Sequence, residues 1–138
     1  MPTPPDKKPT GHLAIRMLAM PADTNVNGDI FGGWVVSHMD LAGASMARKH
    51  ANTRVATVAI EKMVFFAPVH VGDFICCYTT LLKVGRTSMT VLVDTYATDG
   101  GENSSRRLVT EGMFTYVAVD EHGKPIPVNP LRYRLGTV

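Results

Sequence analysis

The sequence is poor in the features that mark secreted, metal-binding or nucleic-acid-binding proteins. Its 138 residues include two cysteines, which are adjacent at Cys76 and Cys77. Adjacent cysteines lack the spacing of a metal site or a disulfide framework, so we interpret them as packing residues in a reducing compartment. The formal net charge of +2 is too small to predict a nucleic-acid partner, although it would tolerate an anionic ligand.

Long apolar runs are absent as well. No stretch has the length and composition of a membrane span or a signal peptide, which predicts a cytoplasmic protein without membrane insertion. The five histidines share no ligand spacing, so we predict no metal site. The chain has neither a Gly-x-Ser-x-Gly nucleophile motif nor a DNA-binding segment. What remains open is an enzyme whose chemistry depends on a carboxylate.

Residues 25–50 organise the rest of the chain. They begin with turn-forming residues, pass through Gly32-Gly33 and continue as an apolar run whose single charge between residues 31 and 47 is Asp40. The apolar side chains recur at nearly 3.6-residue spacing, which predicts a helix. No face of that helix is strongly polar, so we expect it to be buried.

The ends and the middle of this helix carry further signals. Asn27 or Asp29 can cap its start, and the basic residues 48–50 suit the negative end of its dipole. Gly43 is less favourable than alanine inside a helix, which indicates close packing against another element at that position.

Asp40 and the glycine pair suggest a hydrolytic site. Asp40 lies seven residues after Gly33, so both fall on one helix face, roughly 10 Å apart along the axis. The backbone N–H groups of Gly32 and Gly33 point out of the helix N-terminus, where they can hold an oxyanion. The alternative, equally open from spacing alone, is that Asp40 is a core acid satisfied by the protein itself and that the glycines form only a turn.

The remainder of the chain predicts strands. A short run at 13–20 precedes the helix, and four longer runs follow it at 54–66, 74–84, 87–98 and 106–119. Strands joined by tight connections are expected to pair antiparallel, with a bulge at Gly112. The predicted class is α+β, with about five antiparallel strands wrapped around one long helix, and the exposed sheet edges favour self-association. We expect a single domain at 13–128 between a flexible segment, 1–12, and a C-terminal tail, 129–138.

This order of elements resembles the hotdog fold, and the motifs resemble the YciA-type acyl-CoA thioesterases. The most specific motif is LAMPADTNVNGDIFGGW at 18–34, followed by Met39-Asp40. The match continues through FAPVHVGD at 66–73, VGRTS at 84–88 and YVAVD at 116–120.

The resemblance implies hydrolysis of acyl-CoA to CoA and a carboxylic acid, at a site between the two subunits of a hotdog dimer. It also implies that dimers assemble into a trimer of dimers. Asp40 would be the catalytic carboxylate, acting as general base or as nucleophile. Asn25 would orient water or substrate from across the dimer interface, and the N–H of Gly33, together with Gly32, would polarise the thioester carbonyl.

The resemblance also suggests where CoA binds, because three residues match the segment that lines the CoA site: Arg86, Thr87 and Ser88. From the residues alone, Arg86 is equally well a solvated turn residue and Asn25 is a turn former. No metal or other cofactor is implied, and CoA enters only as part of the substrate and product.

Two other functions compete with hydrolysis. A hotdog hydratase would carry a histidine five residues after the helix aspartate, where this chain has Ser45, and a dehydratase would carry a His-Phe-Pro-Gly loop, which is missing. A non-catalytic acyl-CoA-binding or sensing protein would have the same pocket without a working acid, and the presence of Asp40 argues against it. The preferred acyl chain length is not predictable, because the depth of the acyl tunnel depends on packing at the dimer interface.

Overall fold

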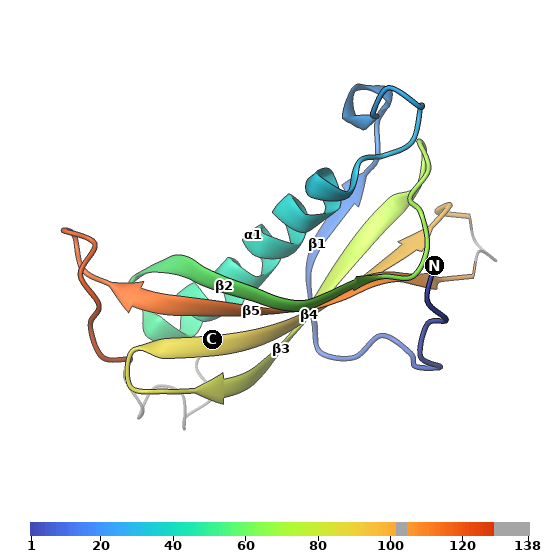
Figure 1. Ribbon diagram of the computed structural model, residues 1–138. Coiled ribbons are helices and arrows are strands. Elements are labelled where there is room, and N and C mark those ends of the chain that lie inside the picture. The colour runs from blue at the N-terminus through green and yellow to red at the C-terminus, as the bar shows by residue number, and fades with distance from the viewer. Residues whose placement is uncertain (102–104, 129–138) are drawn as a thin grey trace.

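The computed structural model describes residues 1–101 and 105–128, and it consists of one helix packed on one face of a curved sheet (Figure 1). The elements are β1 (His12–Leu18), the short 3-10 helix η1 (Pro21–Asp23), α1 (Gly32–Ala51), β2 (Arg54–Phe65), β3 (Phe74–Val84), β4 (Ser88–Thr98) and β5 (Arg107–Val119). Each long strand agrees with its prediction to within about one residue. The predicted tail, 129–138, lies outside the described residues.

The five strands form a single antiparallel sheet in the order β1-β3-β4-β5-β2. The predicted α+β architecture is therefore confirmed. The expectation that tightly joined strands pair is wrong for β2 and β3, which are separated by two strands. The connection at 66–73 crosses the end of the sheet instead, and Asp73 fixes it by accepting hydrogen bonds from the backbone N–H of His70 at 2.9 Å and from Arg107 at 2.5 Å.

The helix is not buried on all sides, contrary to the prediction. One face packs on the sheet through residues such as Val35, Met39 and Ala42, whereas Leu41 on another face is 61% exposed. The physical reason is that a single sheet covers only one side of a helix, so the second apolar face has no partner among the described residues.

The helix ends also differ in part from the prediction. Phe31 is the N-cap residue and its side chain makes no capping hydrogen bond, so the expected caps, Asn27 and Asp29, are wrong. Those two residues instead belong to the preceding turn, where the N–H of Asn25 donates to the carbonyl of Asp29 at 2.7 Å. The basic residues 48–50 do occupy the last turn, as predicted.

The expected bulge at Gly112 lies in the neighbouring strand. The register between β2 and β5 shifts after Thr57 and again between Glu61 and Val64, and at both places the extra residue belongs to β2. Lys62 there adopts a left-handed conformation with φ of 53°. Gly112, on β5, leaves room for the bulged segment of β2. A Cβ at position 112 would come within 2.7 Å of the Met63 side chain.

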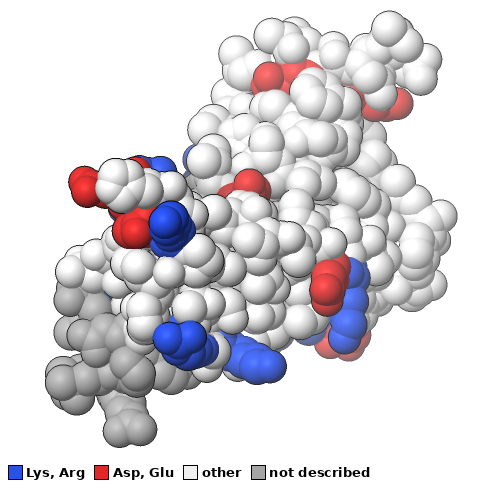
Figure 2. Space-filling model, turned by 60° about the vertical axis from the view of Figure 1, so that its left-hand side comes forward, with Lys and Arg blue, Asp and Glu red and all other residues white. Residues whose placement is uncertain are grey.

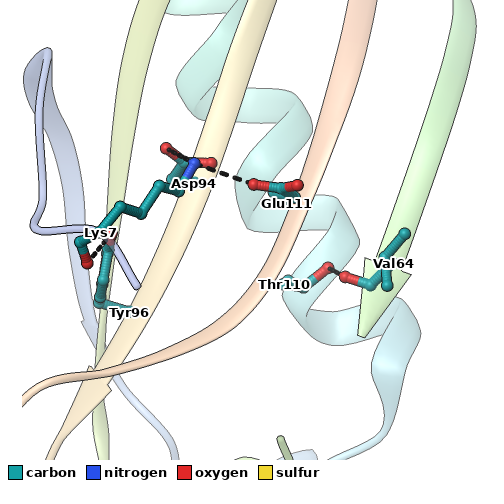
Figure 3. A network of polar contacts seen from close by, with 6 residues as sticks. All are labelled: Lys7, Val64, Asp94, Tyr96, Thr110 and Glu111. Carbon is teal, nitrogen blue, oxygen red and sulfur yellow. Dashed lines mark hydrogen bonds and ion pairs between the residues drawn. The ribbon is translucent and has the colours of Figure 1, made fainter. Parts of the chain in front are cut away.

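The N-terminal segment contacts the face of the sheet opposite α1 (Figure 3). The Lys7 ammonium lies 2.9 Å from both Asp94 and Glu111, which are directly opposed on β4 and β5. Tyr96 donates its hydroxyl hydrogen to the carbonyl of Lys7 at 3.3 Å. Burial raises the pKa of Asp94, and the neighbouring Lys7 charge opposes that rise. Lys7 therefore ties the segment to the sheet through a partly buried ion triad.

The two cysteines are buried and not bonded to each other. Burial raises the pKa of the Cys77 thiol to about 11, which keeps it protonated and unreactive at neutral pH. The interpretation of these cysteines as packing residues is confirmed.

Candidate functional site

Asp40 lies where α1 meets the edge strand β2. Its Oδ1 accepts hydrogen bonds from the Thr57 hydroxyl at 2.8 Å and from the Tyr116 hydroxyl at 3.1 Å. Thr57 and Tyr116 are directly opposed on β2 and β5, so the sheet presents both donors to the same carboxylate oxygen. Sequence reasoning missed these two donors, because they lie on strands 17 and 76 positions away from Asp40.

The carboxylate of Asp40 is partly accessible, although its Oδ1 is satisfied by protein groups, as the alternative expected. Asp40 is half-buried and Thr57 is exposed. Within residues 1–101 and 105–128, Oδ2 of Asp40 accepts no hydrogen bond, whereas Oδ1 accepts two. The site therefore presents one oxygen held by the protein and one oxygen free to contact water or substrate.

The glycine pair supplies free donors at the other end of the same helix face. Gly32 and Gly33 are exposed, and in the described part of the chain neither backbone N–H donates to a protein group. The first amide to be engaged is that of Trp34, which donates to the carbonyl of Phe31 at 3.1 Å. Open amides at a helix N-terminus can hold an anion, and this role of the pair stays a prediction.

Within one chain the donors and the base are too far apart to act on the same carbonyl. Gly33 and Asp40 are separated by roughly 10 Å along the helix axis. One hydrogen bond plus one bridging water reaches only about 6 Å. The prediction that both groups share a helix face holds, but the two groups of one chain do not reach the same carbonyl.

Asn25 lies in the loop that projects past the sheet at the start of α1 (Figure 1). Its Oδ1 accepts from the backbone N–H of Asn27 at 2.9 Å and of Asp29 at 3.2 Å. These bonds give Asn25 the turn-forming role that its residue type indicates. Because Oδ1 faces the loop, the amide NH2 group points away from it and toward solvent.

The segment 86–88 forms the turn between β3 and β4 and is held by backbone hydrogen bonds. The carbonyl of Thr87 accepts from Ala118 at 2.9 Å, and that of Arg86 accepts from Val128 at 2.8 Å. Ala118 is opposed to Val55 on β2, so Thr87 lies two strands, about 10 Å, from that residue. The segment is thus at the same end of the sheet as the last turn of α1.

A basic groove of about 760 Å³ runs between the last turns of α1 and the start of β2. It begins one turn after Asp40, at Ala44, and includes Arg48, Lys49 and Arg54. None of these cations forms an ion pair with an acid among the described residues. Figure 2 brings this end of the molecule forward and shows basic side chains along its lower part, beside a broad uncharged surface.

A smaller apolar cavity of about 220 Å³ adjoins the glycine pair. Its lining includes Gly32, Ile30, Val35 and Phe65. Gly32 therefore borders an apolar space, whereas the basic groove begins one helical turn beyond Asp40.

The described residues contain no group of three or more His, Cys, Asp and Glu side chains arranged to hold a metal ion. They also contain no helix with the length and hydropathy needed to cross a bilayer.

The sequence matches the family model of the Thioesterase superfamily over residues 27–104. The acyl-CoA thioester hydrolase YciA of Salmonella typhimurium is 48% identical over 125 residues, which are 89% of this chain and 94% of that protein. An uncharacterized acyl-CoA thioester hydrolase of Haemophilus influenzae is 49% identical over 116 residues, 83% of this chain and 75% of that protein.

Solved structures agree with the sequence comparison. HI0827, described as a hexameric broad specificity acyl-coenzyme A thioesterase, superposes with a TM-score of 0.86 at 44% identity, covering 94% of this chain and 90% of that one. A hexameric hotdog fold thioesterase of Campylobacter jejuni gives 0.85 at 41% identity, covering 91% and 96%. The predicted hotdog architecture is therefore confirmed.

Proposed function

The chain belongs to the Thioesterase superfamily and, within it, to the YciA-type acyl-CoA thioester hydrolases, and on this basis we propose that it hydrolyses acyl-CoA to CoA and a carboxylic acid. The observation that carries the proposal is the Asp40 carboxylate, which is held through Oδ1 and open at Oδ2 beside a basic groove. A base with one free oxygen suits the removal of a proton from water.

In the proposed reaction Asp40 takes a proton from water while the water oxygen attacks the thioester carbon. The carbonyl electrons move onto oxygen, and the Gly33 N–H, with that of Gly32, stabilises the resulting oxyanion. The C–S bond then breaks and the CoA thiolate leaves, taking up the proton that Asp40 holds. A thioester is electrophilic and a thiolate leaves readily, so we propose a reaction without a metal or other cofactor. Direct attack by Asp40 to form an anhydride is the alternative.

We propose that two subunits complete the site. Asp40 and Gly33 of one chain cannot reach the same carbonyl, whereas a two-fold partner can bring its helix N-terminus to this Asp40. The edge strand β2 suits such pairing, because Val58 and Ile60 on it are exposed apolar residues. Asn25, on its projecting loop, would enter the partner's site, where its free NH2 group could orient water or the carbonyl.

We further propose that such dimers assemble into a trimer of dimers. The support is that both solved relatives described above are hexameric. A cytoplasmic location fits two buried, unbonded cysteines.

The substrate would bind with its CoA moiety in the basic groove and its acyl chain in the apolar cavity of this composite site. The basic groove at Arg48, Lys49 and Arg54 suits the phosphates of CoA. The turn at 86–88 lies at the same end of the sheet and would contact the CoA moiety. The acyl chain would enter the apolar cavity beside the partner's glycine pair.

Thiol release from a panel of acyl-CoAs tests the proposed function. We expect CoA release, and we expect the corresponding acyl-pantetheine thioesters, which lack the nucleotide, to show a higher KM. Arg48→Ala should raise KM for acyl-CoA by about tenfold, with little change in kcat, because a charge-assisted contact is lost. Arg48→Ala should leave KM for acyl-pantetheine unchanged, because that substrate lacks the nucleotide phosphates.

The control for this experiment is Lys8→Ala, which removes an exposed cation from the N-terminal segment and should leave KM unchanged. Tight binding of acyl-CoA without turnover would identify a sensing protein instead of an enzyme. Equal KM values for full-length and truncated thioesters would remove the groove from the substrate site.

A further inference from the structure

We propose that Tyr116 is a positioning residue for the reaction, one that fixes the Asp40 carboxylate so that Oδ2 is the oxygen presented to water. This inference rests on the proposed function, because it assigns to Tyr116 an effect that acts through Asp40. Nothing in the sequence motifs assigns a role to this tyrosine.

The contact is made from inside the core. Tyr116 lies in the middle of β5, its side chain is completely buried, and its ring stacks on Phe114 with a centroid distance of 6.4 Å. Its hydroxyl oxygen is 2.9 Å from the Asp40 carbonyl oxygen and 3.1 Å from Oδ1. A donor with a rigid, packed ring offers a fixed position, whereas the second donor, Thr57, lies on an exposed edge strand.

Gly43, which has no Cβ, leaves the space on α1 that this phenol occupies. A Cβ at position 43 would overlap the Tyr116 hydroxyl oxygen and come within 3.0 Å of two ring carbons. Glycine is less favourable than alanine inside a helix, so its presence there indicates a packing requirement. The residue expected to mark close packing therefore marks the point where the tyrosine passes under α1 to reach Asp40.

Toward Asp40 the phenol acts as a donor. Burial, together with the neighbouring Asp40 carboxylate, raises the pKa of Tyr116 far above its usual value. The proton thus stays on the phenol throughout the working range of pH. Tyr116 is neither a base nor a nucleophile here, and its contribution is to hold and stabilise the charged form of Asp40.

Two consequences follow for the reaction. Donors on Oδ1 bind the charged carboxylate, which is the form of Asp40 that can act as the base. They also prevent rotation about the bond that carries the carboxylate, so Oδ2 stays directed at the open side of the site. Loss of the tyrosine hydroxyl should therefore move the acid limb of activity as well as slow the chemical step.

Tyr116→Phe tests this inference through the pH dependence of kcat/KM. We expect the acid limb to move to higher pH, because the carboxylate anion loses one of its two donors. At the pH optimum we expect kcat to fall by about tenfold with KM changed by less than about twofold, because orientation of the base is affected and substrate binding is not.

Gly43→Ala is the second variant, and it reaches the same contact from the helix side. It adds a methyl group that displaces the phenol while keeping the tyrosine, so it should shift the acid limb in the same direction. It also keeps the inference testable if Tyr116→Phe folds poorly, which thermal denaturation and circular dichroism would report.

Tyr96→Phe is the matched control. It removes the hydroxyl of another buried tyrosine, on the opposite face of the sheet, where the hydroxyl contacts Lys7 (Figure 3). It should leave the pH profile unchanged. If Tyr116→Phe and Gly43→Ala both keep the wild-type acid limb, the inference is overturned. Full activity of Asp40→Asn would instead overturn the proposed role of Asp40 itself. This variant therefore distinguishes failure of the proposed function from failure of the inference about Tyr116.

Discussion

Asp40→Asn is expected to lower kcat for acyl-CoA hydrolysis by roughly 10²- to 10⁴-fold, the range that a general base contributes. Asparagine keeps the shape of the side chain, and its Oδ1 can still accept from Thr57 and Tyr116. What it loses is the ability to take a proton at the open position. The fold and the binding of acyl-CoA should therefore survive, and thiol release with saturating substrate measures the loss.

Asp6→Asn serves as the matched control for that substitution. It makes the same chemical change at an exposed acid of the N-terminal segment and should have wild-type activity. Circular dichroism and thermal denaturation establish that each variant is folded. Wild-type turnover by folded Asp40→Asn would remove this carboxylate from the mechanism.

The double variant Val58→Lys/Ile60→Lys should separate the subunits and abolish turnover. Val58 is 57% exposed and Ile60 is 43% exposed, both on the edge strand β2. Lysines on an edge strand oppose pairing with a second strand, and across a two-fold axis their charges would also repel each other. In the proposed composite site the oxyanion donors come from the partner's helix N-terminus, so a separated chain keeps its own Asp40 and loses those donors.

Size-exclusion chromatography and thiol release together measure this effect. We expect a smaller species by chromatography and a loss of at least about 10²-fold in kcat/KM, which is the cost of removing one oxyanion donor. Val71→Lys places the same charge on an exposed apolar residue in the turn at 66–73, and it should keep both assembly and activity. A fully active monomer would contradict the composite site.

The sequence predicted the elements well where local signals were strong. The limits of β3 and β4 followed from turn residues such as Gly85, which the structure places between the two strands. The partner of β2 was not predictable, because pairing with β5 joins residues about 60 positions apart and no turn connects them. The caps were misjudged because Asp29 pairs with Asn25 within the loop, where the backbone N–H of Asn25 donates to the carbonyl of Asp29. The start of the helix is left without a side-chain cap.

Only the part of the candidate site that comes from one continuous segment was predictable. Asp40 and the glycine pair share one segment, so helical spacing alone placed them on one face. Thr57 and Tyr116 come from two strands that meet only in the folded sheet. One signal could have identified the tyrosine. Tyr116 lies two residues after Phe114, so both side chains face inward from β5, and a buried tyrosine hydroxyl needs a hydrogen-bond partner.

The exposure of the helix was misjudged for a related reason. Leu41 is apolar but faces away from the only sheet. Sequence pattern reports that a face is apolar, and it does not say whether the covering surface comes from the same chain or from another copy. The apolar outer face is consistent with the subunit pairing proposed above.

Subunit complementation tests the central claim most directly. Asp40→Asn lacks the base, and Gly33→Pro lacks the oxyanion donor while keeping the helix, because proline is tolerated in the first turn. Each variant alone should be inactive. Mixed after dissociation and reassembly, they form dimers in which one of the two sites combines an intact Asp40 with an intact Gly33 from the other chain. The account predicts recovery of about a quarter of the wild-type rate on random mixing. No recovery from verified mixed dimers would contradict it, because it would place both groups of each site within a single chain.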